Sequence, residues 1–95
     1  MTRELLDAES ITAALSELPG WRAEGASLKK EFAFSDYLKG AKFVQYASEN
    51  AEGMDHHPDL LLRWRKVEVT LSTHSAGGIT ALDVELARRI EDLEV

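Results

Sequence analysis

The residues of this chain that are best suited to proton transfer are its three histidines, which fall within nineteen residues at His56, His57 and His74. An imidazole ordinarily titrates near pH ~6.5, so it can donate or remove a proton close to neutral pH. Two carboxylates come just before the pair, Glu52 four residues and Asp55 one residue ahead of His56. A carboxylate beside an imidazole can fix its tautomer and raise its basicity. These five residues are therefore candidates for an acid–base site.

The proline after the histidine pair predicts that the two imidazoles diverge. Pro58 disfavours helical geometry at His57 and favours an extended conformation there. In extended chain, successive side chains point in opposite directions. One imidazole of the pair can then face a cleft while the other braces it.

Several of the nearby residues also have a purely structural explanation. Asp83 lies three residues after Thr80, which is the spacing of a helix capping box, and a cap alone explains an aspartate there. Trp64 fits a core position better than a stacking platform, although it can wall the pocket of a flat heterocycle. His74 by itself fits an ordinary exposed histidine at a strand end, although strand ends beside glycine loops are also where sites are built.

Taken together, these positions resemble the signature of the pterin-4a-carbinolamine dehydratases. That signature has an acidic residue, three residues, His-His-Pro, five residues, an aromatic residue, nine residues, a histidine, eight or more residues and an aspartate. The segments Asp55-His56-His57-Pro58 and Ser72-Thr73-His74 also match the usual wording of the family. The matching signature positions are Glu52, His56, His57, Pro58, Trp64, His74 and Asp83.

The resemblance implies dehydration of 4a-hydroxytetrahydropterin to quinonoid dihydropterin, which recycles the cofactor of aromatic amino acid hydroxylases. It implies acid–base catalysis by the histidines, with no metal or nucleotide cofactor. We expect His56 and His74 to approach the C4a/N5 edge of the pterin and His57 mainly to place the substrate. The residues expected to bind the substrate or orient the imidazoles are Glu52, Asp55, Trp64 and Asp83, together with Ser72 and Thr73 through backbone groups near them.

Two other interpretations stay open at this point. Three histidines and two carboxylates are a plausible ligand set for zinc or iron, although the divergence expected of His56 and His57 argues against it. Alternatively, the chain is a non-catalytic pterin-binding or protein-dimerisation module that binds a partner through an apolar helix. Some relatives assist dimerisation of a homeodomain transcription factor as well as catalyse.

The composition bounds the class of protein. Ninety-five residues predict one domain spanning 1–95 with a modest core, which oligomerisation would help. No apolar run approaches the ~20 residues of a membrane span, and the first residues lack the apolar segment of a secretory signal, so we expect a cytoplasmic protein. The absence of cysteine excludes thiol catalysis and thiolate metal sites. A net charge of −6 argues against direct binding to nucleic acid.

The helical segments are predicted from apolar residues at helical spacing. Ile11, Ala14, Leu15 and Leu18 predict a first helix that Ser10 caps and that ends at Pro19-Gly20. A long helix is predicted over 37–51 after the cap offered by Ser35-Asp36, and a last helix opens with the Thr80–Asp83 capping box. The helix over 37–51 is apolar over more than half a turn, so it covers either the core alone or also a partner subunit.

The strands predict an α+β fold. Segments 21–24 and 28–34 flank the turn signal Gly25-Ala26 and predict a hairpin. Segments 60–65 and 66–73 predict a second pair of strands, in which Val67, Val69 and Leu71 alternate with polar residues. The order α-β-β-α-β-β-α then predicts a four-stranded antiparallel sheet with three helices packed on one face. The resemblance implies the same fold, as a homodimer or homotetramer.

Overall fold

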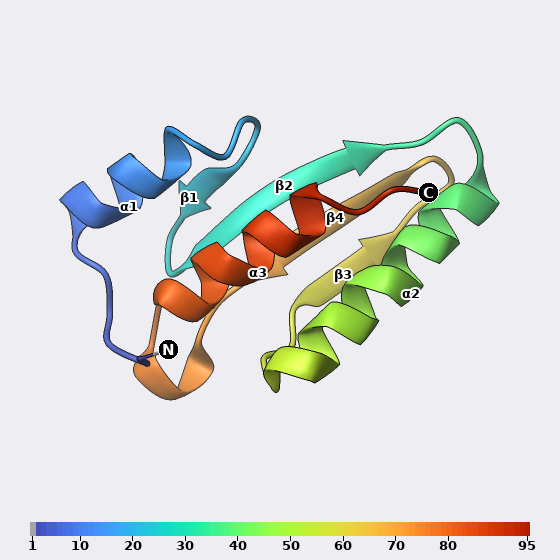
Figure 1. Ribbon diagram of the computed structural model, residues 1–95. Helices are drawn as coiled ribbons and strands as arrows, with labels where there is room; N and C mark the ends of the chain where they lie inside the picture. The colour runs from blue at the N-terminus through green and yellow to red at the C-terminus, as the bar shows by residue number, and fades with distance from the viewer. Residues whose placement is uncertain (1) are drawn as a thin grey trace.

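The chain folds into three α-helices, one short 3-10 helix and four strands over residues 2–95, which the computed structural model describes (Figure 1). The elements follow one another in the order α-β-β-α-β-β-α, as the sequence predicts. Their bounds are α1 Ala8–Leu15, β1 Arg22–Glu24, β2 Ser27–Ala33, α2 Tyr37–Met54, β3 Asp59–Leu62, β4 Lys66–Leu71, the 3-10 helix η1 His74–Ala76, and α3 Ala81–Glu91.

The four strands form one antiparallel sheet in the order β1-β2-β4-β3. β4, the last strand of the chain, is therefore an inner strand with a partner on each side. On its outer side it pairs with β3, with Asp59 opposite Thr70 and Leu62 opposite Val67. This register brings the residues just before β3 beside those just after β4. The predicted α+β class with a four-stranded antiparallel sheet is confirmed.

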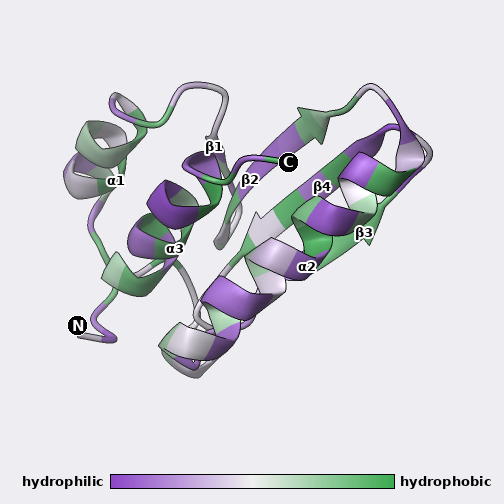
Figure 2. Ribbon diagram, turned by 45° about the vertical axis from the view of Figure 1, so that its right-hand side comes forward, coloured by the Kyte–Doolittle hydropathy of each residue, from purple (hydrophilic) through white to green (hydrophobic). Residues whose placement is uncertain are grey.

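Strand β4 shows the predicted alternation most clearly. Val67, Val69 and Leu71 are completely buried beneath the helices, whereas Glu68 and Thr70 point to the opposite, helix-free face. A period of two residues is what a strand with one core face requires. Figure 2 shows hydrophobic and hydrophilic residues in alternating bands along the helices as well.

The helices cover one face of the sheet, as predicted. α2 contacts α3, β3 and β4, and α3 contributes the buried residues Leu86 and Ile90 to the core between helices and sheet (Figure 1). α1 lies beside α3, where Arg88 of α3 comes within 3.4 Å of Glu17. The segment after α1 is anchored by Trp21, which is buried and donates a hydrogen bond to the Glu91 carboxylate at 2.7 Å.

The broad apolar stripe of α2 serves mainly the intramolecular core. Phe43, Ala47 and Ala51 are buried against the sheet, and the Phe43 ring lies 4.7 Å from that of Phe32. Gly40 allows the close approach, because a Cβ atom there would lie 3.0 Å from the Leu62 side chain. The sequence left open whether this stripe covers the core alone; the structure shows that its central residues do.

Two local predictions are wrong. Asp7 rather than Ser10 caps α1, because the Asp7 carboxylate accepts a hydrogen bond from the Ser10 backbone N–H at 2.8 Å, so the helix begins one turn earlier. This hydrogen bond also lowers the pKa of the Asp7 carboxyl. Trp64 is not in the core: it lies in the turn between β3 and β4 with 70 % of its surface exposed. No helix within residues 2–95 has both the length and the apolar character needed to cross a bilayer.

The packing of α2 predicts a sharp difference between two neighbouring aromatic residues. Phe43→Ala should lower the free energy of unfolding by about 3–5 kcal/mol, because it empties a buried site between the sheet and the helix. Tyr46→Ala, at a half-buried position one turn along, should lower it by less than half as much. Urea denaturation followed by far-UV circular dichroism measures both values. Equal losses would show that Phe43 is not a core residue.

Candidate active site

The end of α2 places the histidine pair. Asp55 caps the helix in the left-handed conformation, with φ 49° and ψ 43°. The Asp55 backbone N–H donates a hydrogen bond to the Glu52 carbonyl oxygen, and the His56 backbone N–H donates one to the Ala51 carbonyl oxygen, each at 3.1 Å. Such a reversal closes a helix by satisfying its last carbonyls. It also turns the chain back towards the sheet, so that His56 points into the molecule.

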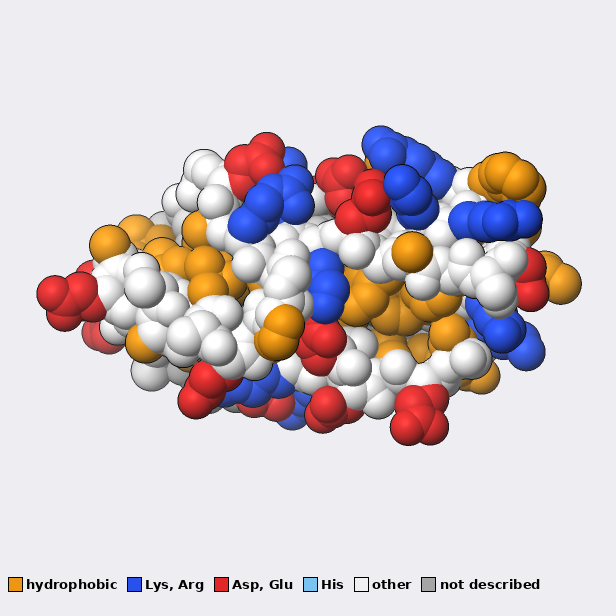
Figure 3. Space-filling view, turned by 90° about the horizontal axis from the view of Figure 1, so that it is seen from above, with side chains coloured by type: hydrophobic (Ala, Val, Ile, Leu, Met, Phe, Trp, Pro, Cys, Tyr) orange, Lys and Arg blue, Asp and Glu red, His pale blue; other side chains and the backbone are white. Residues whose placement is uncertain are grey.

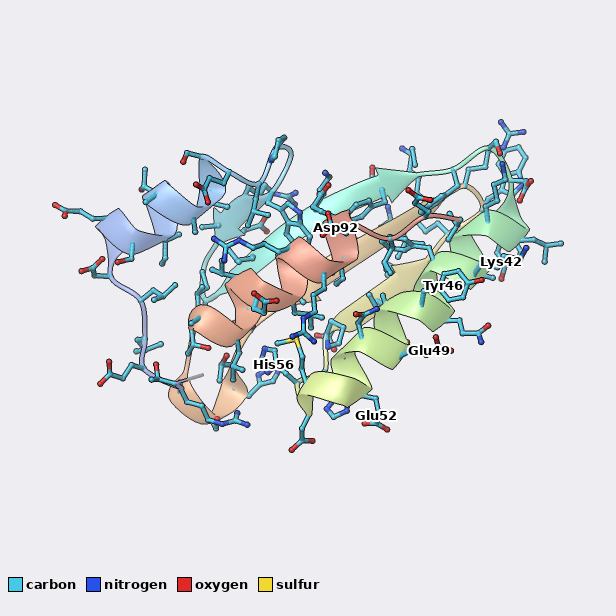
Figure 4. All side chains as sticks on the ribbon, viewed as in Figure 1. Lys42, Tyr46, Glu49, Glu52, His56 and Asp92 are labelled. Atoms are coloured by element: carbon cyan, nitrogen blue, oxygen red, sulfur yellow. The ribbon has the colours of Figure 1, made fainter. Side chains whose placement is uncertain are left out.

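His56 is buried and bonded to a buried carboxylate. Its side chain, labelled in Figure 4, is only 6 % exposed. Its Nε2 atom lies 2.6 Å from Oδ1 of Asp83, which is completely buried. A buried charged or polar group is tolerated when its hydrogen bonds are satisfied. The pair therefore holds the imidazole in one orientation at the end of the sheet.

Asp83 is held in place from two further segments. Its Oδ2 atom accepts from the Thr80 backbone N–H at 2.9 Å and from the Thr73 hydroxyl at 2.8 Å. The first contact completes the predicted capping box at the start of α3, so the capping role of Asp83 is confirmed. The same carboxylate also orients His56. The sequence had instead predicted that Glu52 and Asp55 orient the imidazoles.

His57 lies outside, in a separate pair. Its Nε2 atom is 2.8 Å from Oε1 of Glu52, and both side chains are largely exposed, by 60 % and 78 %. An ion pair this exposed contributes little to stability, because water screens it. The prediction that His56 and His57 diverge is confirmed: one is braced in the interior and the other reaches solvent. Glu52 thus accompanies His57.

The third histidine lies at the same end of the sheet. His74 begins η1, directly after the buried Thr73, and its side chain is exposed. The Thr73 hydroxyl is used internally by Asp83, and the Ser72 hydroxyl donates to the Ala26 carbonyl at 2.8 Å. Both hydroxyl protons are therefore used within the protein.

Trp64 is not brought to this group. It lies in the turn at one end of β3 and the histidine pair lies at the other, a separation of roughly 20 Å at about 3.3 Å per strand residue. The Arg65 guanidinium covers its ring at 4.4 Å. Within one copy of the chain, Trp64 cannot wall a pocket that contains His56.

A hollow elsewhere on the molecule competes with the histidine end as a candidate site. A hollow of about 370 Å³ lies along α1, lined by Ala8, Glu9, Thr12 and Ala13, and it contains no histidine. That hollow offers one exposed carboxylate, Glu9, and no other acid–base group, so the histidine end is the better candidate for proton transfer. No histidine is visible in the view from above in Figure 3, which places the site away from that face.

The geometry supplies proton-transfer groups. A buried imidazole backed by a carboxylate can accept a proton and keep the resulting cation paired, and two exposed imidazoles stand nearby in the fold. Among residues 2–95, no three histidine, aspartate or glutamate side chains are placed to hold one metal ion. Thr80 is the one member of the buried network that the sequence identified only as part of a helix cap, since its contact with Thr73 depends on tertiary structure.

The left-handed conformation of Asp55 predicts a stability gain on substitution. Asp55→Gly should raise the free energy of unfolding by roughly 0.5 kcal/mol. Glycine has no Cβ atom to clash in this conformation, and this gain exceeds the larger loss of backbone entropy that glycine suffers on folding. Asp55→Ala, which keeps the Cβ atom but loses the short polar side chain, should be less stable than the wild type. Urea denaturation of the three proteins provides the comparison, and an alanine variant more stable than the glycine variant would contradict it.

The sequence matches one protein family along nearly its whole length. The profile of the family described as pterin 4 alpha carbinolamine dehydratase matches residues 4–93. A protein of Mycobacteroides abscessus with the provisional name pterin-4-alpha-carbinolamine dehydratase is 49% identical, over 92% of this chain and 93% of its own. A protein of Mesorhizobium japonicum with the same provisional name is 47% identical, over 95% and 94%.

Solved structures share the fold. The crystal structure of a transcriptional coactivator/pterin dehydratase from Brucella melitensis superposes with a TM-score of 0.87 at 34% identity, covering 90% of this chain and 94% of that one. A pterin dehydratase-like protein identified as a RuBisCO assembly factor in the alpha-carboxysome has a TM-score of 0.60 at 22% identity, covering 75% and 82%. At that identity the second likeness concerns the fold alone.

Proposed function

Because this chain belongs to the pterin 4 alpha carbinolamine dehydratase family, we propose that it dehydrates 4a-hydroxytetrahydropterin to quinonoid dihydropterin and water. The observation that carries the proposal is the buried His56–Asp83 pair, with Nε2 and Oδ1 2.6 Å apart, at the end of the sheet that also carries His57 and His74. A pair of positioned acid–base groups is what this elimination needs.

The reaction requires one proton to be delivered and one removed. Protonation of the C4a hydroxyl lets the C4a–O bond break with loss of water, the N5 electron pair forms the C4a=N5 double bond, and the N5 proton leaves. In our proposal His56 and His74 carry these protons, and His57 with Glu52 places the pterin. A positioned acid or base typically contributes ~10²–10⁴-fold to such a step.

The remaining candidate residues have supporting roles in this proposal. Asp55 and Glu52 offer exposed carboxylate oxygens, which are acceptors for the N–H groups of a pterin. Asp83 acts through His56. Ser72 and Thr73 frame the site through the path of the chain, since their hydroxyls are bonded elsewhere. Trp64 contributes to a site only if a second copy of the chain brings it there.

The test is turnover of freshly generated 4a-hydroxytetrahydropterin, followed by absorbance against the uncatalysed rate. The wild type should accelerate the dehydration, and His56→Ala and His74→Ala should each lower kcat by about 10²-fold or more, because each removes a proton carrier. His57→Ala should mainly raise KM. Circular dichroism of each variant establishes that it is folded. Full turnover by folded His74→Ala would remove His74 from the proposed mechanism.

The physiological setting belongs to the proposal as well. Recycling of the pterin cofactor of an aromatic amino acid hydroxylase is the pathway role that this reaction serves. A cytoplasmic location stays a prediction from the sequence.

A non-catalytic pterin-binding or dimerisation module is the alternative. The Brucella melitensis protein is described as a coactivator as well as a dehydratase. A partner-binding stripe on α2 would need Phe43 at the surface, but here Phe43 is buried in the core. Pterin binding without acceleration by folded wild-type protein would favour this alternative.

We also propose that the chain forms a homo-oligomer through the outer side of α2. An exposed stripe there carries Leu38, Lys42, Glu49 and Gly53, spaced to lie on one face of the helix. Figure 4 shows Lys42 and Glu49 along this helix. Lys42 and Glu49 are equally far from the midpoint of the stripe, as are Leu38 and Gly53. An antiparallel second copy would therefore place each lysine opposite a glutamate and each leucine over a glycine.

The helix dipole supports such pairing. Lys39 stands in the first turn of α2 and Glu52 in its last turn, the reverse of what the macrodipole favours. A second, antiparallel copy would supply an opposite charge at each position, and this compensates for the unfavourable arrangement in a single chain.

Charge reversal tests the oligomer. Lys42→Glu should weaken self-association by at least about tenfold, because the two-fold symmetry creates two like-charge pairs in place of two ion pairs. The double variant Lys42→Glu/Glu49→Lys restores opposite charges and should associate as the wild type does. Sedimentation velocity over a concentration series measures this. Unchanged association in both variants would place the interface elsewhere, and a monomeric wild type would refute the oligomer.

A further inference from the structure

We propose that Thr73 and Thr80 are positioning residues that fix the tautomer of His56 through Asp83, so that the Nδ1 atom of His56 is the one that faces the substrate. The inference rests on the proposed function for its catalytic consequence. Its structural content is a hydrogen-bond chain that runs from α3 through both threonines to the Asp83 carboxylate, which His56 meets from the other side.

The acceptor capacity of Asp83 sets the first step. Its Oδ2 atom accepts from the Thr80 backbone N–H and the Thr73 hydroxyl, and its Oδ1 atom lies 2.6 Å from His56 Nε2. In this proposal the carboxylate is ionised. An ionised carboxylate can only accept hydrogen bonds. His56 must then carry its proton on Nε2, which leaves Nδ1 as the acceptor nitrogen of the neutral ring.

The two threonines continue the chain away from the histidine. The Thr73 hydroxyl has a single proton, which it gives to Asp83, so at the 2.8 Å contact between the two hydroxyls Thr80 must be the donor. The Thr80 oxygen in turn accepts from the Leu82 backbone N–H at 3.2 Å. The order is therefore Leu82 N–H to Thr80, Thr80 to Thr73, and Thr73 to Asp83, and every proton points towards the carboxylate.

The exposure of the imidazole supports the same assignment. Every fully buried polar side-chain atom within residues 2–95 has a hydrogen-bond partner. Nδ1 of His56 has none among these residues, since the one hydrogen bond of the ring is made by Nε2. Nδ1 must therefore belong to the small part of the ring, 6 % of the residue, that reaches the surface. The nitrogen opposite the carboxylate is thus the one available to a ligand.

A purely structural cap does not account for the whole arrangement. The capping box of α3 needs only Thr80 and Asp83, and it is complete without any third residue. Thr73 belongs to a different segment, just after β4, and it is buried to 1 % exposure with its hydroxyl on both members of the box. Its hydroxyl is therefore the link whose removal separates positioning from capping.

The experiment compares Thr73→Val and Thr80→Val with the conservative Thr73→Ser and Thr80→Ser variants. Nitrogen-15 NMR of the His56 ring reports the tautomer without any turnover. The wild type should show the Nε2–H form. The valine variants should show a mixture of tautomers, because without the threonine chain on Oδ2 the Asp83 carboxylate is no longer held with Oδ1 against Nε2. The serine variants should show the wild-type form. With pterin substrate, the valine variants should lose about tenfold in kcat with KM within about twofold, as expected when an orienting partner outside the reacting groups is lost.

Asp7→Ala is the matched control for the loss of a helix cap. It removes the cap of α1, which is remote from the histidines, and should lower the unfolding temperature without changing the His56 tautomer or kcat. A wild-type His56 that carries its proton on Nδ1, or a folded Thr73→Val variant with wild-type tautomer and kcat, would overturn the inference. If one valine variant does not fold, the other valine variant decides it.

The two proposals fail in different ways. Suppose that the wild type shows the Nε2–H tautomer, that Thr73→Val changes it, and that the wild type does not accelerate the dehydration. That result would support the positioning role and refute the dehydratase. A wild-type protein that accelerates the reaction while its tautomer ignores both threonines refutes the positioning alone.

Discussion

The carboxylate of Asp83 is the interaction on which the arrangement of this protein depends. It is completely buried, and three segments far apart in the sequence supply its donors: the start of α3, the end of β4 through Thr73, and the end of α2 through His56. A buried carboxylate left without these donors would destabilise the fold by several kcal/mol. The same group therefore starts a helix, joins two layers of the fold and orients an imidazole, so scaffold and candidate site are held by one set of bonds.

Much of the fold follows from local patterns. The alternation of Val67, Val69 and Leu71 predicted β4, and the spacing of Thr80 and Asp83 predicted the start of α3, because both patterns act within a few residues. Local patterns also explain the failures. Both Asp7 and Ser10 are good capping residues, and the structure uses Asp7. The hydrophobicity of Trp64 suggested the core, but its place in a tight turn keeps it out.

The candidate site was predictable as a set of residues more than as a geometry. The spacing from Glu52 to Asp83 indicated which residues belong together, and Pro58 predicted that His56 and His57 diverge. Which of the two is buried depends on the reversal at Asp55 and on a partner for His56 that lies 27 residues away. The sequence assigned Glu52 and Asp55 to the imidazoles by proximity, whereas the structure pairs Glu52 with His57 and gives His56 to Asp83. Contacts of this range depend on tertiary packing, which no local pattern encodes.

The position of Asp83 along the chain has a consequence for folding during translation. A ribosome releases the histidine pair, β3 and β4 well before α3, because synthesis runs from the amino end. Until α3 emerges and docks, His56 has no carboxylate and Thr73 has no acceptor. The nascent chain can therefore build its central hairpin early, but the buried imidazole takes its final orientation only when the last helix arrives.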